Sequence, residues 1–344
     1  MSWKEKRLIT ILSIILAVLC AAVLIVLSIR YRAARAAKDQ NTVSPSEIAA
    51  AAQSDYVALS YSNGSTTLSF SLNESGVWIW DSEPDFPVDD SNIRTILTIL
   101  ETLKPQQTLD MPEDLSAYGL DTPEIHLTAT APDGAALTIT MGNTTTDGTS
   151  YYAAINSDPA HIFILAGTLY QAMQTPVYQM CRLPALPELT ESTIASIQLQ
   201  GPQVEQVDLE GNVTQVRNST VLTAEQSEDS GVSWRSGGAN ITDDPSLRAL
   251  LEDLGGLRVT ECVDFRPSDA AASFCGFQDP VTLTVNYKAA TGVETVFEMN
   301  IGAQNMDGTG RYVRFGDEMA IYLMELELLD PMMRLAYQGM EETA

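Results

Sequence analysis

The sequence is poor in the residues and motifs from which enzyme sites are usually built. It has two histidines and four cysteines in 344 residues, and the cysteine spacing fits no zinc or redox motif. It also lacks Gly-x-Ser-x-Gly, His-Glu-x-x-His, a phosphate-binding loop and a dinucleotide-binding fingerprint. We therefore predict no catalytic residue, no cofactor site and no metal site.

Basic residues are also scarce. Lys and Arg total 19 against 45 Asp and Glu, and residues 1–38 hold seven of the basic residues but one acid. Residues 39–344 therefore hold 12 basic and 44 acidic residues, which gives them a formal charge of −32. Such a surface repels nucleic-acid phosphates and anionic lipid headgroups, so nucleic acid is excluded as a partner. The surface fits a basic partner, loosely held divalent cations, or solubility alone.

The cysteines leave one question open. Cys20 lies in an apolar segment, whereas Cys181, Cys262 and Cys275 follow much later in the chain. A disulfide among these three would leave one over, and Cys262 and Cys275 are the nearest pair in sequence. A structural, reduced role is the simpler interpretation.

One long hydrophobic run stands near the start of the chain. Residues 8–29 are 22 positions without a charge, about 33 Å of helix against a hydrocarbon core of about 30 Å. The alternative is a cleaved signal peptide, but Arg30 and Arg32 stand where small residues should mark cleavage. We predict a short N-terminus (1–7), a transmembrane helix (8–29) and a linker (30–54).

Charges on the two sides of this run are nearly balanced, so the positive-inside rule does not orient it. The short N-terminus and the acidic remainder favour an N-terminus in the cytoplasm. We therefore expect a single-pass protein of the cell membrane, held through residues 8–29, with most of the chain extracytoplasmic.

The chain contains a duplicated unit. The stretch Asp114–Leu165 resembles the later stretch Asp269–Met324. Gly119 and Pro123 of the first stretch both recur 157 positions later. Five residues of the first stretch recur 160 positions later: Gly142, Asp147, Gly148, Thr149 and Tyr152 become Gly302, Asp307, Gly308, Thr309 and Tyr312. Repetition of this kind predicts two structurally similar units in tandem.

Each unit has the same order of predicted elements. Alternating residues around Asn63-Gly64 predict a hairpin, and an apolar helix face follows. That face comprises Ile93, Ile96, Leu97, Leu100 and Leu103, and it recurs 154 positions on as Leu247, Leu250, Leu251, Leu254 and Leu257. We predict an α+β fold of two similar antiparallel-sheet-plus-helix domains, 55–182 and 190–338, with residues 218–233 as a long loop.

Paired aspartates and three tryptophans are the candidate functional residues. Asp90 and Asp244 directly precede the two predicted helices, where a side chain caps the helix. With Asp89 and Asp243 they form adjacent carboxylates, which can also serve acid–base chemistry or bind calcium. The tryptophans are core or sheet-face residues, or a stacking platform for a ligand. The candidate partner or ligand surface is therefore Trp78, Trp80, Asp89, Asp90, Trp234, Asp243 and Asp244.

Several segments together resemble a known family. A single membrane helix is followed by Gly-x-Trp-x-Trp (76–80), a Pro-Asp-Phe-Pro-Val-Asp loop, an apolar helix and Asp-Leu-Ser-Ala-Tyr-Gly-Leu-Asp-x-Pro (114–123). This series resembles the domain-of-unknown-function family 4340, found mainly in bacteria, over most of residues 55–180. The second unit departs from the pattern at several positions of 275–280. Members are often encoded beside gliding-type ABC transporter components, so the resemblance implies an extracytoplasmic accessory role and no catalytic residues.

Two functional hypotheses follow. The first is a non-enzymatic, membrane-anchored extracytoplasmic module that binds a protein partner or ligand, as an accessory subunit of an ABC transporter. The alternative is a cell-envelope hydrolase or metal-dependent enzyme that uses the paired aspartates.

Overall fold

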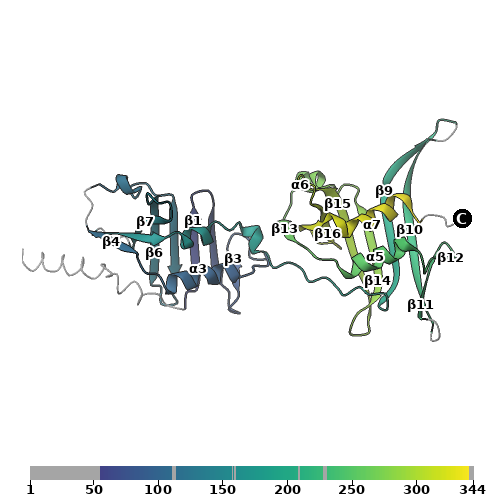
Figure 1. Cartoon of the computed structure of the whole chain (residues 1–344), viewed down its shortest axis with the longest axis horizontal. Helices are drawn as coiled ribbons and strands as arrows, with labels where there is room; N and C mark the ends of the chain where they lie inside the picture. Colours follow the sequence, from purple (N-terminus) through teal and green to yellow (C-terminus); the bar gives the residue numbers. More distant parts are fainter. Residues whose placement is uncertain are drawn as a thin grey trace, which may run out of the picture. The chain divides into compact units, whose positions relative to one another are not determined.

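The computed structural model describes residues 55–340 except 111–113, 157, 159, 208, 209 and 228–230 (Figure 1). The predicted transmembrane helix and linker therefore lie outside the described residues. None of the helices that are described is long and apolar enough to cross a membrane.

The fold is α+β, as predicted, and it consists of two units. The first unit ends at Thr175, and the second begins at Pro176. One short segment breaks this order, because Phe86–Asp89 lies within the first unit in sequence but belongs to the second unit. Each unit contains one antiparallel sheet and its helices.

The described part of the first unit forms an eight-stranded sheet in the order β3-β2-β1-β5-β6-β7-β8-β4. In that order the strands are β3 (Trp78–Trp80), β2 (Thr67–Leu72), β1 (Ala58–Asn63), β5 (Ile125–Thr130), β6 (Ala136–Thr144), β7 (Ser150–Ile155), β8 (His161–Ala166) and β4 (Gln107–Asp110). Its opening hairpin turns at Gly64, whose φ of 89° is the left-handed conformation that Asn-Gly predicts.

The second unit forms a nine-stranded sheet in the order β12-β11-β10-β9-β14-β15-β16-β17-β13. In that order the strands are β12 (Ala239–Asn240), β11 (Gly231–Ser236), β10 (Val213–Ser227), β9 (Ile194–Val207), β14 (Val281–Lys288), β15 (Glu294–Gln304), β16 (Gly310–Phe315), β17 (Ile321–Glu325) and β13 (Glu261–Asp264). Apart from β12, each strand has a counterpart at the same place in the first sheet. The duplication predicted from the sequence is therefore a duplication of topology.

The helices follow the same correspondence. They are α3 (Ser91–Glu101), α4 (Thr168–Met173), α5 (Pro245–Gly255), α6 (Asp269–Phe274) and α7 (Leu326–Gln338), with 3₁₀ turns η1 (Ser116–Tyr118) and η2 (Val177–Met180). In each unit two helices pack together, α3 with α4 and α5 with α7. The second helix of each pair also contacts the sheet, α4 at β1 and α7 at β9 and β10.

The predicted apolar helix faces are the buried ones. Ile93, Ile96 and Leu100 of α3 are fully buried. Their counterparts in α5 are also buried: Leu247, Leu250 and Leu254. Burying each such side chain contributes about 1.5–3 kcal/mol, so these two faces are a main reason why the helices stay on their sheets.

The repeated glycines allow a helical turn to pack directly on a strand. In the first unit, a Cβ at Gly142 would collide with the carbonyl oxygen of Tyr118, and one at Gly119 would lie 2.6 Å from Asn143 Oδ1. In the second unit, a Cβ at Gly302 would collide with the carbonyl oxygen of Cys275. The pairing register also shifts at the same place in β6 and β15. The repeated stretch around these glycines thus specifies a bulge and a close backbone contact.

One prediction for the second unit is wrong. Residues 218–233 were expected to be a long loop, but β10 continues to Ser227 and β11 begins at Gly231. Leu222 is fully buried and Thr220 nearly so, whereas Val221 faces solvent. The segment is therefore a strand with one polar, exposed face, and its composition resembles a loop because half of its residues never enter the core.

Candidate interaction surface

Two of the three candidate tryptophans are buried in the sheets. Trp78 lies opposite Leu72 on β2, and Trp234 lies opposite Ala224 on β10. Both indoles are buried, with Trp234 fully inaccessible. Trp234 is therefore the counterpart of Trp78. Trp80, which lies on β3 with Trp78, is half-buried. The Trp234 ring therefore offers no face to a ligand, whereas the Trp78 ring lines a hollow of the first unit.

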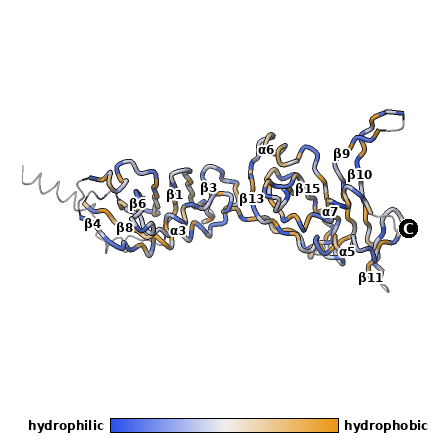
Figure 2. The backbone as a smooth tube through the Cα atoms, turned by 45° about the horizontal axis from the view of Figure 1, so that its top comes forward, coloured by the Kyte–Doolittle hydropathy of each residue, from blue (hydrophilic) through white to orange (hydrophobic). Residues whose placement is uncertain are grey.

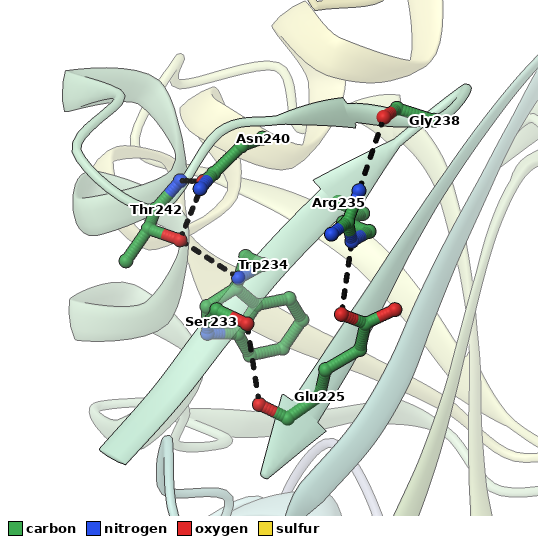
Figure 3. Close-up of polar contacts among 7 residues, drawn as sticks. All are labelled: Glu225, Ser233, Trp234, Arg235, Gly238, Asn240 and Thr242. Carbon is green, nitrogen blue, oxygen red and sulfur yellow. Dashed lines mark hydrogen bonds and ion pairs between the residues drawn. The ribbon is translucent and has the colours of Figure 1, made fainter. Parts of the chain in front are cut away.

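The backbone around Trp234 is held by a local polar network (Figure 3). The Trp234 amide donates to Thr242 Oγ1 at 2.9 Å, and Thr242 donates its own hydroxyl to Asn240 Oδ1 at 2.8 Å. The Trp234 indole Nε1 is buried and has no hydrogen-bond partner among the residues that the structure describes. These contacts fix the turn between β11 and α5.

On the exposed side of the same strand, Arg235 Nε donates to Glu225 Oε2 at 2.9 Å, across β10 and β11 (Figure 3). Both side chains are about half exposed. A pair of this kind contributes at most about 1 kcal/mol to stability.

The two helix N-termini differ. Asp244 caps α5, because its Oδ1 accepts a hydrogen bond of 2.7 Å from the Ser246 amide. Asp90 was predicted to cap α3, and that prediction is wrong: its side chain makes no capping bond and instead pairs with Arg94 Nη2 at 2.7 Å. Pro245 follows Asp244 and favours an extended backbone before it, whereas Asp90 has ψ near 5°.

The paired aspartates do not form a metal centre. Asp89 belongs to the second unit and its amide donates to Met180 O at 2.7 Å, whereas Asp90 belongs to the first unit. Within the described ranges, no group of three or more acidic, histidine or cysteine side chains is placed to hold a metal ion. Asp243 lies beside the capping residue Asp244, where no such group forms.

Sequence reasoning missed the segment Phe86–Asp89, which we call the strap. Val88 pairs with Cys181 in an antiparallel bridge, and the Arg182 amide donates to Pro87 O at 2.6 Å. The Phe86 ring packs edge-on against Phe265 with ring centroids 5.3 Å apart. The available signal was the pair of apolar residues on either side of Pro87, Phe86 and Val88, which are both buried.

The most distinctive surface is a projecting hairpin of the second unit, which we call the arm: residues 203–207 of β9 with 213–217 of β10. In Figure 1 these ends of the two strands extend beyond the rest of their sheet. β14 pairs with β9 only as far as Gln200, and β11 pairs with β10 only from Leu222 onward. Both outer edges of the arm therefore lack a neighbouring strand within the described residues.

Valines stand opposite one another on both faces of the arm. Val204 pairs with Val216 on one face, and Val207 pairs with Val213 on the other. Val207 is 61% exposed and Val213 is 57% exposed. Figure 2 shows hydrophobic positions alternating with hydrophilic ones along β9 and β10. An exposed strand edge that also carries paired valines is a template for another strand.

The base of the arm is clamped by one carboxylate. Asp279 accepts from the Gln203 amide at 2.6 Å and from Arg217 Nη2 at 2.5 Å. This pair neutralises the one basic side chain of the arm. Glu205, which accepts from Gln215 Nε2 at 3.1 Å, gives the rest of the arm a negative charge.

The first unit has no such arm. Its equivalent strands, β1 and β2, are six residues each and close directly through the Gly64 turn. The strands β9 and β10 have 14 and 15 residues. The arm is therefore the largest local difference between the two copies.

Each unit carries an open hollow. One, with a volume of about 650 Å³, lies in the first unit, where Trp78, Arg94 and Glu101 contribute to its wall. Another, of about 630 Å³, lies in the second unit beside Tyr287 and Lys288. The linings of these two hollows include no histidine or cysteine.

Comparison with known proteins places the chain in a family without an assigned activity. The family described as "Domain of unknown function (DUF4340)" matches residues 78–272, more than half of the chain. The match reaches from β3 into α6, further along the chain than the 55–180 of the resemblance. No curated protein and no solved structure matches the chain.

Proposed function

The chain belongs to the DUF4340 family, a domain of unknown function, and from its architecture we propose a non-enzymatic module that binds a protein partner. The module is anchored in the cell membrane through residues 8–29, with its two units outside the cytoplasm. The uncharged length of that segment supports the anchor. The resemblance described above supports an accessory role beside an ABC transporter.

The observation that carries this proposal is the arm. A two-stranded hairpin on its own is at best marginally stable in water, and it needs a third strand or a packed face. Here no described strand pairs with either outer edge, and the valine pairs remain exposed. An added strand would satisfy the free backbone groups and cover the valines at the same time.

The chemistry of the arm indicates the kind of strand that would bind. The chain beyond residue 38 is strongly acidic. Within the arm, Arg217 is neutralised by Asp279, so Glu205 keeps its negative charge. A partner segment with alternating apolar and basic side chains would complement both features. We therefore propose an extended, basic segment of a membrane-associated protein as the ligand of the arm.

We do not carry the enzymatic alternative forward. Its candidate groups were the paired aspartates, but the Asp244 carboxylate caps α5 and the Asp90 carboxylate pairs with Arg94. Among the residues that the structure describes, neither pair belongs to a group of three or more acidic, histidine or cysteine side chains.

The proposal is tested by affinity purification of the full chain from membranes after chemical cross-linking. The variant Val207→Thr/Val213→Thr keeps β-branched side chains on the arm but makes them polar. Val221→Thr is the matched control, because Val221 is an exposed valine of β10 outside the arm. We expect transporter subunits with the wild type and the control, and at least a tenfold loss with the arm variant.

Equal recovery with the arm variant would overturn the arm as the binding surface. Recovery of the chain alone from every preparation would overturn the binding function. Thermal unfolding of all three proteins provides the folding control, and we expect the same midpoint because the substituted valines are exposed.

A further inference from the structure

The histidine that begins β8 lies between two carboxylates of the first unit. Asp158 precedes β8 in the chain, and Asp110 ends β4, the edge strand that pairs with β8. The pairing register places Asp110 directly opposite His161. His161 Nδ1 lies 2.7 Å from Asp158 Oδ2, and His161 Nε2 lies 3.7 Å from Asp110 Oδ1. Each ring nitrogen therefore faces a carboxylate oxygen.

Asp158 fixes the orientation of the imidazole ring. Its side chain is 2% exposed, and its second oxygen, Oδ1, accepts from the Ala160 amide at 2.8 Å. An ionised carboxylate only accepts hydrogen bonds, so His161 Nδ1 is the donor of the 2.7 Å contact. In the neutral ring the other nitrogen then carries no hydrogen. The lone pair of Nε2 is therefore directed to the side on which Asp110 lies.

The space between Nε2 and Asp110 has the dimensions of a metal site. At 3.7 Å the two atoms are too far apart for a hydrogen bond. Zinc binds histidine nitrogen at about 2.0–2.1 Å and carboxylate oxygen at about 2.0–2.2 Å, so two such bonds span about 4.2 Å end to end. One ion can therefore contact both atoms where they stand. The Asp110 side chain is 92% exposed and that of His161 is 32% exposed, which gives the ion access from solvent.

We propose that His161 and Asp110 bind a divalent transition-metal ion of the Zn²⁺ or Cu²⁺ type, with Asp158 as the residue that positions the histidine. Imidazole nitrogen is a preferred ligand of these ions. A ligating histidine almost always donates its other N–H to a carboxylate, a carbonyl or water, as His161 donates to Asp158. Two side chains contact the ion, and water takes the remaining positions. The formal charge of −32 over residues 39–344 attracts cations to the surface.

The second unit keeps one of the two ligands and lacks the other. Its edge strand β13 pairs Asp264 with Ile321 of β17, at the place where β4 pairs Asp110 with His161. Isoleucine offers no ligand atom, and Asp264 Oδ1 instead accepts from Tyr178 Oη at 3.4 Å. The site therefore belongs to the first unit alone, where the ion would join the edge strand β4 to β8.

The test uses the full chain in detergent, stripped of metal with a chelator that is then removed, and titrated with zinc chloride by calorimetry. We expect the wild type to bind one Zn²⁺ at this site and His161→Ala to bind it about tenfold more weakly or worse. His126→Ala is the matched control, because it removes the chain's other histidine, an exposed residue of β5. It should bind zinc as the wild type does.

Two further variants separate the ligand from the positioning residue. Asp110→Asn removes the charged oxygen ligand from an exposed position, so it should fold normally and lose about tenfold or more in affinity. Asp158→Asn leaves both ligands in place and should cost about 10–100-fold in affinity, because the ring loses its charged acceptor. Unchanged affinity in His161→Ala or in Asp110→Asn would overturn the site, and unchanged affinity in Asp158→Asn would overturn its positioning role.

Electron paramagnetic resonance of the Cu²⁺ form gives a second readout. We expect the spectrum to show coupling to a single nitrogen in the wild type and in His126→Ala, and none in His161→Ala. A nitrogen signal that persists in His161→Ala would overturn the assignment of the ligand.

The metal site and the partner proposed above can fail separately. The arm variant Val207→Thr/Val213→Thr lies in the second unit and should bind zinc as the wild type does. Asp110→Asn leaves the arm intact and should recover transporter subunits in full. Loss of zinc binding in the arm variant would contradict the placement of the site in the first unit.

Discussion

The opening hairpin of the first sheet closes after six residues in each strand, whereas its counterpart in the second sheet continues for 14 and 15. All other strands of the first sheet have a topological equivalent in the second. The two units thus keep the same strand order, while a solvent-exposed hairpin differs in length. The added length carries unpaired edges and exposed valines, which is where we place binding.

The strongest test of this equivalence is the buried tryptophan that each unit places on its third strand. Trp78→Ala and Trp234→Ala should each lower the free energy of unfolding by about 3–5 kcal/mol, because a large cavity remains. Trp80→Ala is the control and should cost less than half of that, since its ring is half-buried. Chemical denaturation measures all three. A small effect at Trp78 alone would break the correspondence between the two copies.

The repeated glycines should give the next largest effect. Gly142→Ala and Gly302→Ala each force a methyl group into a backbone carbonyl, and we expect each to cost about 1–3 kcal/mol. Gly255→Ala in α5 is the control, because its Cβ would make an ordinary contact of 3.4 Å with Leu189 O. It should be neutral or stabilising by up to about 1 kcal/mol. Similar unfolding curves for all three variants would contradict the packing role of the motif.

The N-termini of α3 and α5 test a position at which the two units differ. Asp244→Ala removes a capping bond and should cost about 1 kcal/mol. Asp90→Ala removes only an exposed pair with Arg94, worth about 0.3–0.5 kcal/mol. Thermal unfolding of the two variants measures the difference. Equal losses would show that the ion pair replaces the cap energetically.

The smallest expected effect is a pH response confined to one copy. Hydrogen bonds from Thr145 and Thr149 lower the pKa of Asp147, so the turn it holds is stabilised above the carboxyl's ordinary pKa of about 4. That stabilisation is lost as the pH falls through the lower folded-state pKa. The equivalent turn is held by the amide of Asn305, which accepts from the Thr309 amide at 3.0 Å and does not titrate.

Amide hydrogen exchange measures this response. The Thr149 amide should lose protection in acid at a higher pH than the Thr309 amide does. Asp147→Asn is the matched variant, and it should make the first turn as insensitive to acid as the second. Loss of protection at the same pH in both turns would assign it to general unfolding.

The sequence predicted the elements whose pairing is local. Alternation and turn residues predicted the β1–β2 hairpin, and a 3.6-residue period predicted α3 and α5. It did not indicate β4, which pairs with β8, or the strap, which pairs with residues near Cys181. In each case the pairing partner lies more than 50 residues away in the sequence, so no local pattern identifies that partner.

The candidate surface was predictable only in part. The tryptophans and aspartates were chosen for their chemistry, but burial and capping account for Trp78, Trp234 and Asp244. The arm escaped notice because its residues are polar on average, and their valines become prominent only when the strands are paired.

The strap also has a consequence for the order in which the protein is made. Phe86 and Val88 leave the ribosome long before Tyr178, Cys181 and Phe265, against which they are packed or paired. During synthesis these two apolar side chains therefore lack their native contacts until most of the second unit has emerged. A chain that stopped at Thr175 would keep them exposed permanently, so nascent chains of intermediate length are the ones that should most readily attract a chaperone.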